Sequence, residues 1–190
     1  MPSSEQTRER LIDLAHDLFA ERGYAAVGTE EIVARAGVTH GALYHHFRDK
    51  QDLFQAVFER LEERMIASIV SRMAGIEDPW EELVTGVRAA LDTSTEPAVM
   101  RISLLDAPAV LGWREWREIG ARYSLGLVAA GLRNAIDQGV FREQEVTPLA
   151  HMLVGALSEA GMMIANSDDP PATRREVEPP LLSLLSGLRG

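Results

Sequence analysis

The chain has 190 residues, of which 46% are hydrophobic and 6% aromatic, and its formal net charge is −10. It has no cysteine, which excludes disulfides, cysteine-ligated metal centres and a thiol nucleophile, and which fits a reducing cytoplasm. It has no run of 18 apolar residues and no apolar segment at its start, so we expect neither a membrane span nor a signal peptide.

Nearly every segment has a helical hydrophobic period, and none alternates in the manner of a strand. A capping box at Ser3 and Gln6 predicts the start of the first helix, and Gly23 predicts its end. Thr29 predicts the N-cap of a short second helix, which Gly37 ends.

The next helices have similar start signals. Thr39, Asp49 and Asp78 predict the N-caps of the third, fourth and fifth helices, and a proline follows the last of these. Pro97 predicts the start of a sixth helix, which we expect Pro108 to interrupt.

The C-terminal part begins with a long predicted helix at about 113–138, and another follows at about 147–166. We expect a loop at 168–171. Thr173 is a candidate cap for the last helix, but prolines at 179–180 would break its interior. That helix is therefore either kinked at the prolines or begins near them.

The prediction is an all-α protein of about nine helices, with a boundary between residues 1–49 and 50–190. In the first unit, two short helices flank Gly37 and Val38, and they need to pack against the first helix to form a core. This is the geometry of a helix-turn-helix, whose second helix enters the major groove of DNA. Most of the negative charge lies in the second unit, but the first unit is not basic either, so charge alone does not indicate DNA.

The predicted third helix has an outer face of short or planar hydrogen-bonding groups, which suit base edges and phosphates. This face comprises Thr39, His40, Gly41, Tyr44, His45 and His46. Thr29 and Lys50 lie at helix N-termini on either side, where a helix dipole and free N–H groups favour a phosphate. A polar outer face on a plain three-helix core explains the same pattern equally well. The spacing of the histidines does not place two on one helix face, so we expect no metal site.

The segment GTEEIVARAGVTHGALYHHFRDKQDLF closely resembles the DNA-binding domain of the tetracycline-repressor (TetR) family. The resemblance covers about residues 8–55 and includes the run A-x-x-L-F-x-x-x-G-Y, which starts at Ala15, and the core L-Y-x-H-F, which starts at Leu43. It implies a homodimer, one recognition helix per subunit and an inducer pocket in the C-terminal domain. By position, it implies DNA contacts at Thr29, Thr39, His40, Gly41, Tyr44, His45 and Lys50, with Tyr44 and Lys50 on phosphates. Glu30 departs from the family, whose members often have a base-reading or phosphate-contacting residue there, and it leaves the target sequence open.

The predicted helix at 147–166 is rich in small residues, which let helices approach closely. In the family, the last two helices of each subunit form the dimer interface, so the resemblance implies an interface here. Ordinary packing against the preceding helix is the alternative. We expect a ligand pocket of adaptable methionines and aromatic surface, formed by Leu104, Trp116, Tyr123, Met152, Glu159 and Met163. The alternative is that these are core residues, with Glu159 at an exposed or inter-subunit edge.

An enzyme is the main rival class. A helical di-iron site needs paired Glu-x-x-His motifs, and the chain has none. It also lacks a phosphate-binding glycine loop and a G-x-S-x-G elbow. An architectural DNA-binding protein would not need about 140 further residues of apolar helices. We therefore expect a cytoplasmic, ligand-responsive transcriptional regulator without a cofactor, rather than an enzyme. It would be a repressor that binds a palindromic DNA operator as a dimer and is released by a small, largely apolar inducer.

Overall fold

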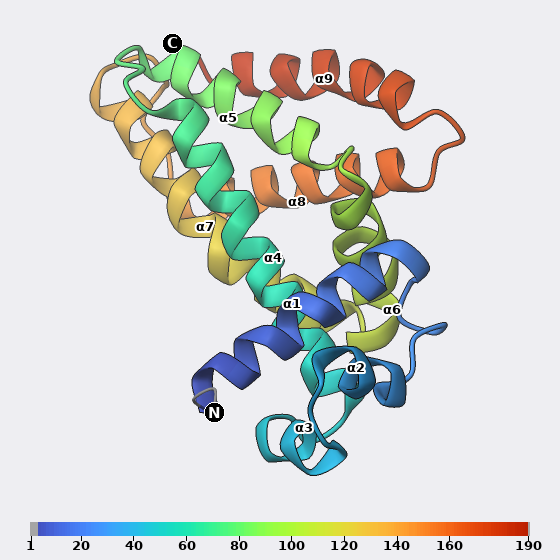
Figure 1. Ribbon diagram of the computed structural model, residues 1–190. Helices are drawn as coiled ribbons and strands as arrows, with labels where there is room; N and C mark the ends of the chain where they lie inside the picture. Colours follow the sequence, from blue (N-terminus) through green and yellow to red (C-terminus); the bar gives the residue numbers. More distant parts are fainter. Residues whose placement is uncertain (1–3, 190) are drawn as a thin grey trace.

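The computed structural model describes residues 4–189, and within them the chain forms nine α-helices and one π-helix, η1 (Figure 1). The prediction of an all-α fold with about nine helices is confirmed. The elements are α1 (Ser4–Arg22), α2 (Thr29–Ala36), α3 (His40–His46), α4 (Lys50–Met73), α5 (Pro79–Thr93), η1 (Val99–Asp106), α6 (Ala107–Leu111), α7 (Trp113–Asp137), α8 (Val146–Ala165) and α9 (Pro170–Ser186).

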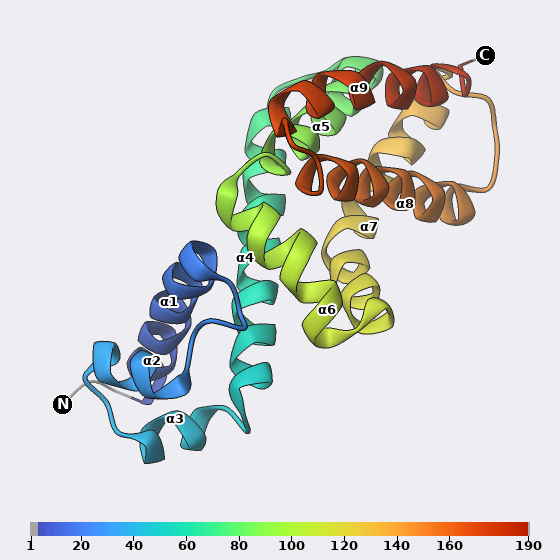
Figure 2. The ribbon, with the colours of Figure 1, turned by 90° about the vertical axis from the view of Figure 1, so that its right-hand side faces the viewer.

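The helices form two groups that α4 connects (Figure 2). At one end, α1, α2 and α3 gather around the first half of α4, and at the other end α5, α8 and α9 pack with the second half of α7. Each end has its own apolar core, and η1 and α6 contribute to the core that also contains α1. Phe54 and Phe58 of α4 are fully buried in that core, so it contains residues from both sides of the predicted boundary.

Three of the predicted N-caps are confirmed. Oγ1 of Thr39 accepts a hydrogen bond from the Ala42 amide at 3.2 Å, and Oδ1 of Asp49 accepts one from the Asp52 amide at 2.8 Å. Asp78 caps α5 in the same way. The prediction for Thr29 is wrong, because α2 begins at that residue and Gly28 before it has the extended backbone of the N-cap. The predicted cap at Ser3 lies outside the described residues.

The predicted interruption at Pro108 is also wrong. The chain runs from η1 into α6 without leaving helical dihedral angles, since Asp106 has φ −79° and ψ −42°. Proline has no N–H to donate to the carbonyl four residues earlier. A π-helix uses bonds to residues five apart, so a stretch of π-helix before the proline changes the hydrogen-bonding pattern without ending the helix.

The last helix begins earlier than either predicted alternative. Asp169 is its N-cap and accepts a hydrogen bond from the Ala172 amide at 2.9 Å. The expected loop at 168–171 is therefore wrong in its second half, since prolines are tolerated in the first turn, where amides have no helical partner. The predicted cap at Thr173 is wrong for the same reason. Pro179 and Pro180 lie inside α9, which continues to Ser186.

Candidate functional site

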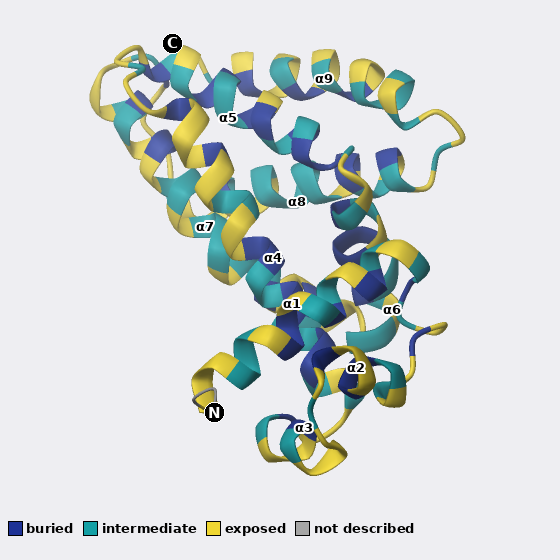
Figure 3. Ribbon diagram, in the orientation of Figure 1, coloured by how far each residue is buried: buried dark blue, intermediate teal, exposed yellow. Residues whose placement is uncertain are grey.

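The outer surface of α3 is held in place by its buried inner face. Leu43 is fully buried and Phe47 nearly so, and both belong to the core around α1. The opposite side of α3 is exposed at the far end of the molecule (Figure 3). Its exposed residues include all five of the predicted DNA contacts on α3 and at its cap, namely Thr39, His40, Gly41, Tyr44 and His45. The sixth residue of the predicted outer face, His46, is half-buried.

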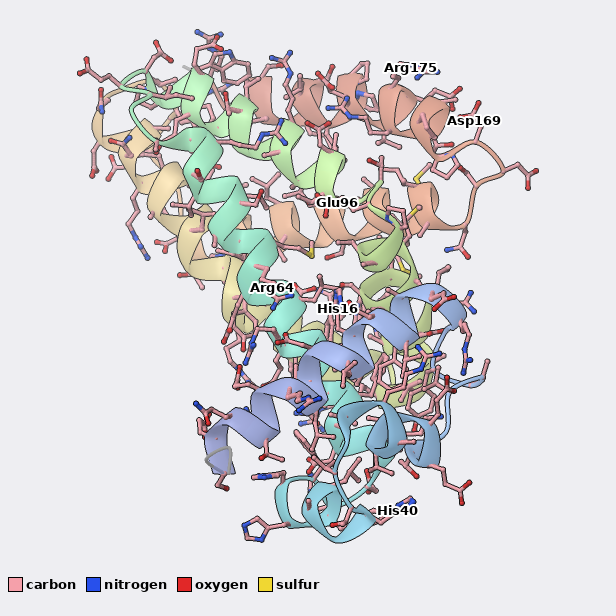
Figure 4. The ribbon with its side chains drawn as sticks, viewed as in Figure 1. His16, His40, Arg64, Glu96, Asp169 and Arg175 are labelled. Atoms are coloured by element: carbon pink, nitrogen blue, oxygen red, sulfur yellow. The ribbon has the colours of Figure 1, made fainter. Side chains whose placement is uncertain are left out.

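Two rings on this surface lie parallel. The centroids of the His40 and Tyr44 rings are 6.3 Å apart with an interplanar angle of 20°, and Tyr44 is 52% exposed. His40 lies at the outer end of the molecule, directed away from α1 (Figure 4). A Cβ atom added to Gly41 would meet only Oγ1 of Thr39, at 3.7 Å, which is an ordinary contact. The fold itself therefore does not require a glycine at this position.

Lys50, at the start of α4, is tied to the turn after α1. Its Nζ donates a hydrogen bond to the carbonyl of Tyr24 at 2.6 Å and lies 3.9 Å from the centroid of the Tyr24 ring. Burial lowers the pKa of Lys50, and the nearby carboxylate of Asp106 offsets part of this effect. Thr29 is half-buried at the start of α2. The structure thus places both predicted flanking residues at helix starts, with Lys50 already engaged by the protein.

The same turn is connected to η1 by two polar contacts that the sequence did not reveal. The Tyr24 amide donates to Oδ2 of Asp106 at 2.7 Å, and Nη2 of Arg101 donates to the carbonyl of Arg22 at 3.2 Å. Gly23 between them has φ +78°, and a side chain there would overlap the Arg101 guanidinium. The only sequence signal was the presence of two charged residues in an otherwise apolar run.

A cavity of about 170 Å³ lies toward the other end of the molecule, among α4, α5, η1, α7 and α8, and its lining includes Phe58, Leu104 and Trp116 of the core that contains α1. Its walls are mainly aliphatic, with contributions from Phe58, Met65, Ile69, Val87, Leu127, Leu153 and Leu157. Glu62 and Ser103 are buried polar residues in the lining, whereas Arg117 and His151 are its exposed residues and mark its rim.

The structure brings together only part of the predicted ligand site. Leu104 and Trp116 are buried and line the cavity. Tyr123, Met152, Glu159 and Met163 are not among the lining residues. The hydroxyl of Tyr123 donates instead to Oε1 of Glu63 at 3.4 Å on the outside of α4.

The three predicted residues of α8 lie on one exposed face. Spacings of seven and eleven residues bring Met152, Glu159 and Met163 to the same side of a helix. All three are exposed, Met152 by 71% and Met163 by 50%. The alternative expectation for Glu159, an exposed or inter-subunit edge, matches its position better than a pocket does.

Glu62 is the functional candidate that the sequence analysis missed. It is only 9% exposed, and its Oε1 accepts a hydrogen bond from the Ser103 hydroxyl at 2.7 Å. Nε1 of Trp116 donates to the Ser103 carbonyl at 2.8 Å, which fixes this part of η1. Burial raises the pKa of Glu62, and the hydrogen bond from Ser103 offsets part of that rise. The available signal was a glutamate four residues after Phe58, on the apolar stripe of α4.

The raised pKa makes a prediction about stability. Neutral Glu62 makes its full contribution to the free energy of unfolding below the unfolded-state pKa, near 4.5. This contribution is lost as the pH rises through the higher folded-state pKa of the group. Glu62→Gln should therefore stabilise the protein increasingly over this interval, by up to about 1.4 kcal/mol per pH unit. Urea unfolding at several pH values measures this gain. The exposed neighbour provides the control Glu63→Gln, which should show no such trend, and a gain from Glu62→Gln that does not vary with pH would contradict the prediction.

Two family models match the chain. Residues 11–57 match the family described as bacterial regulatory proteins, tetR family, and residues 80–188 match the tetracyclin repressor-like C-terminal domain. The first match contains α2 and α3. The second begins at the second residue of α5 and contains η1 and every later helix.

Individual relatives agree with these matches. The chain is 28% identical over 151 residues to the transposon Tn10 TetC protein of Escherichia coli, covering 80% of this chain and 76% of that protein. It is 34% identical over 138 residues to the transcriptional regulator SrpR of Pseudomonas putida, covering 72% of this chain and 64% of that protein.

Solved structures extend the similarity over the whole fold. The crystal structure of a TetR-family transcriptional regulator from Pectobacterium atrosepticum has a TM-score of 0.88 and 36% identity, covering 98% of this chain and 95% of that one. The structure of RolR in complex with resorcinol has a TM-score of 0.76 and 25% identity, covering 95% and 88% of the two chains. SrpR and the Pectobacterium protein are transcriptional regulators rather than enzymes, as expected from the sequence. The chain therefore belongs to the TetR family of DNA-binding transcriptional regulators.

Proposed function

We propose that the protein is a repressor that binds a palindromic operator as a homodimer and leaves it when a small, largely apolar inducer fills the cavity. Regulators of this family bind DNA and small molecules, typically as dimers. The observation that carries the proposal is the exposed hydrogen-bonding surface of α3 at one end, with a mainly aliphatic cavity at the other. A DNA-binding regulator of this kind acts in the cytoplasm.

In this proposal, α3 lies in the major groove. His40 reads a base edge from the start of the helix, and Gly41 lets the backbone come close to the bases. Alanine would fit at Gly41 in the free protein, so a requirement for glycine would arise only against DNA. Thr39, His45 and Tyr44 complete the contact surface on α3, with Tyr44 on a phosphate. Thr29 and Lys50 contact phosphates from the two neighbouring helices.

The proposed dimer interface is the uncovered apolar face of α8 and the neighbouring surface of α9. α8 is apolar along most of its length, and only 28% of its most apolar stretch is buried. By length and composition this helix could cross a membrane, which the sequence analysis did not expect. In a DNA-binding regulator, a second copy of the chain is the better cover for this face. Leu184 of α9 is a further exposed apolar side chain, at 66%, on a helix that packs against α8.

The proposed inducer is small because the cavity is small, and largely apolar because most of the cavity walls are aliphatic. RolR, which has the same fold, is known in complex with resorcinol, a small aromatic molecule. That precedent supports a ligand of similar size here.

Occupancy of the cavity has a short route to the DNA-binding end. Ser103 and Leu104 of η1 line the cavity, while Arg101 and Asp106 of the same element contact the turn after α1. A displacement of η1 would move that turn and, through Tyr24, the start of α4. For release, the inducer must bind the conformation that does not fit the operator more tightly than the one that does.

Selection from a random library of DNA duplexes tests the proposed function. We expect the recovered sequences to share an inverted repeat whose half-sites are separated by about one turn of DNA or slightly more. Recovery of sequences without any shared motif, at a protein concentration that retains DNA, would contradict recognition by α3.

Lys50 provides a prediction about phosphate contacts. Only one of the three N–H donors of its ammonium is used by the described part of the protein, so the others are available to a phosphate. Lys50→Met should reduce the slope of log affinity against log salt concentration by about 0.9 per subunit. The control is Arg64→Met on the exposed side of α4, where Arg64 pairs with Asp13 far from α3 (Figure 4). Fluorescence anisotropy at several salt concentrations gives both slopes, and equal slopes for the two variants would remove Lys50 from the interface.

A further inference from the structure

The cavity has a polar floor within its aliphatic walls. Glu62 on α4 and Ser103 on η1 meet there through the hydrogen bond at 2.7 Å, and both side chains are buried. That bond uses Oε1 of the glutamate, and Oε2 has no hydrogen-bond partner among the described residues. Oε2 is not among the fully enclosed unpartnered side-chain atoms of the described residues, so it is accessible from the cavity that Glu62 lines. A bound molecule can therefore supply its hydrogen-bond partner.

The charge of the floor limits which molecules fit. Burial favours the protonated form of Glu62, which can both donate and accept a hydrogen bond. A carboxylate ligand would meet another acid at the floor. An ammonium ligand would have to ionise Glu62 and lose its own hydration, which for a buried pair often cancels the attraction between the charges. Arg117 at the rim, whose guanidinium lies over the Trp113 ring, adds positive charge there and also disfavours a cation.

We propose that Glu62 and Ser103 select the inducer, and that it is an uncharged molecule with an apolar body and a hydroxyl group that binds at this pair. The inference rests on the proposed function, because it assigns chemistry to the cavity in which the inducer is placed. A hydroxyl is both donor and acceptor, so it matches a protonated carboxyl.

The position of the pair also gives this contact a regulatory consequence. The hydrogen bond between Glu62 and Ser103 joins α4, which leads to the DNA-binding end, to η1, which contacts the turn after α1. A hydroxyl that binds at this bond would change the link between the two elements. A purely apolar molecule in the same cavity would leave the link intact.

Three molecules of nearly the same shape test the selection: 2-phenylethanol, propylbenzene and 2-phenylethylammonium. Calorimetric titration of the full chain should show the alcohol binding about tenfold more tightly than either of the others, as expected for one buried hydrogen bond. Glu62→Gln should retain this preference within about threefold, because an amide also donates and accepts. Glu62→Leu should abolish it. Ser103→Ala is a second variant at the floor and should also reduce the preference for the alcohol.

Several outcomes would overturn the inference. One is that the ammonium binds most tightly of the three molecules and loses its binding in Glu62→Gln. Another is that Glu62→Leu keeps the same preference for the alcohol. The third is that none of the three molecules binds. Thermal unfolding and operator affinity of each variant show whether it is folded, and Glu62→Gln and Ser103→Ala decide the question if Glu62→Leu is not. If the protein binds the operator but none of the three molecules, the inference about the inducer is wrong and the proposed DNA-binding function is unaffected. Binding of the alcohol without any effect on operator affinity would support the selection by Glu62 and argue against the role of the cavity in induction.

Discussion

Replacing Met152 and Met163 together with aspartate is expected to convert the proposed dimer into a monomer and to weaken operator binding by about 100-fold or more. Both side chains lie on the exposed, largely apolar face of α8 that also contains Glu159, at 71% and 50% exposure in the single chain. A twofold axis would place two copies of each new carboxylate in the interface, and α8 itself contains no lysine or arginine to pair with them. Because a monomer holds only one half-site, the affinity gained from simultaneous binding of two recognition helices would be lost.

Light scattering and operator titration measure the two effects separately. Val70→Asp is the matched control, because Val70 is an apolar residue of α4 with 45% exposure that lies outside α8 and α9. It should leave both the mass and the affinity unchanged. A double variant that remains dimeric, or a parent protein that is monomeric at micromolar concentration, would show that the interface lies elsewhere.

His40→Ala is expected to cost about 1–3 kcal/mol of binding free energy on the best operator and to relax the sequence preference at one or two positions of each half-site. His40 is the first residue of α3, it is exposed, and its ring lies parallel to that of Tyr44. In the proposed complex, its position at the helix N-terminus would direct the ring into the groove, where either nitrogen can meet a base edge. The fold should be unaffected, since the ring contributes nothing to the apolar core.

The control for this prediction is another histidine. His16 lies on α1 beside Asp17, well separated from α3 (Figure 4). His16→Ala should change operator affinity by less than about 0.5 kcal/mol. The measurement is the ratio of affinities for the operator and for single-base variants of each half-site. An unchanged ratio in His40→Ala would place base reading on other residues of α3.

The helices were predictable because local signals determine them. Asp49 and Asp78 act as N-caps because a carboxylate accepts from free amides whatever the tertiary context, and Gly37 ends α2 in the left-handed region. The errors arose at prolines, because a proline can either end a helix or lie within one. Pro108 and Pro170 both looked like breaks, but one follows a π-helix and the other starts a helix, and only the hydrogen-bonding pattern around them decides between these outcomes.

The exposed face of α3 was predictable from helical period, whereas the cavity was not. Period alone assigns Met152 and Met163 to one face of α8 but does not say whether that face meets a cavity, another helix or a second chain. Glu62 was missed because burial of a glutamate depends on Ser103, which lies 41 residues away in sequence on a different element. Long-range pairing of this kind leaves no periodic signal.

The most direct test of the account is an anisotropy titration of the selected palindrome, with a scrambled duplex of the same composition measured beside it at the same salt concentration. The account predicts two chains bound for each pair of half-sites and a preference for the palindrome of about 10³-fold or more. Equal affinity for the two duplexes, or saturation with one chain per palindrome, would contradict it.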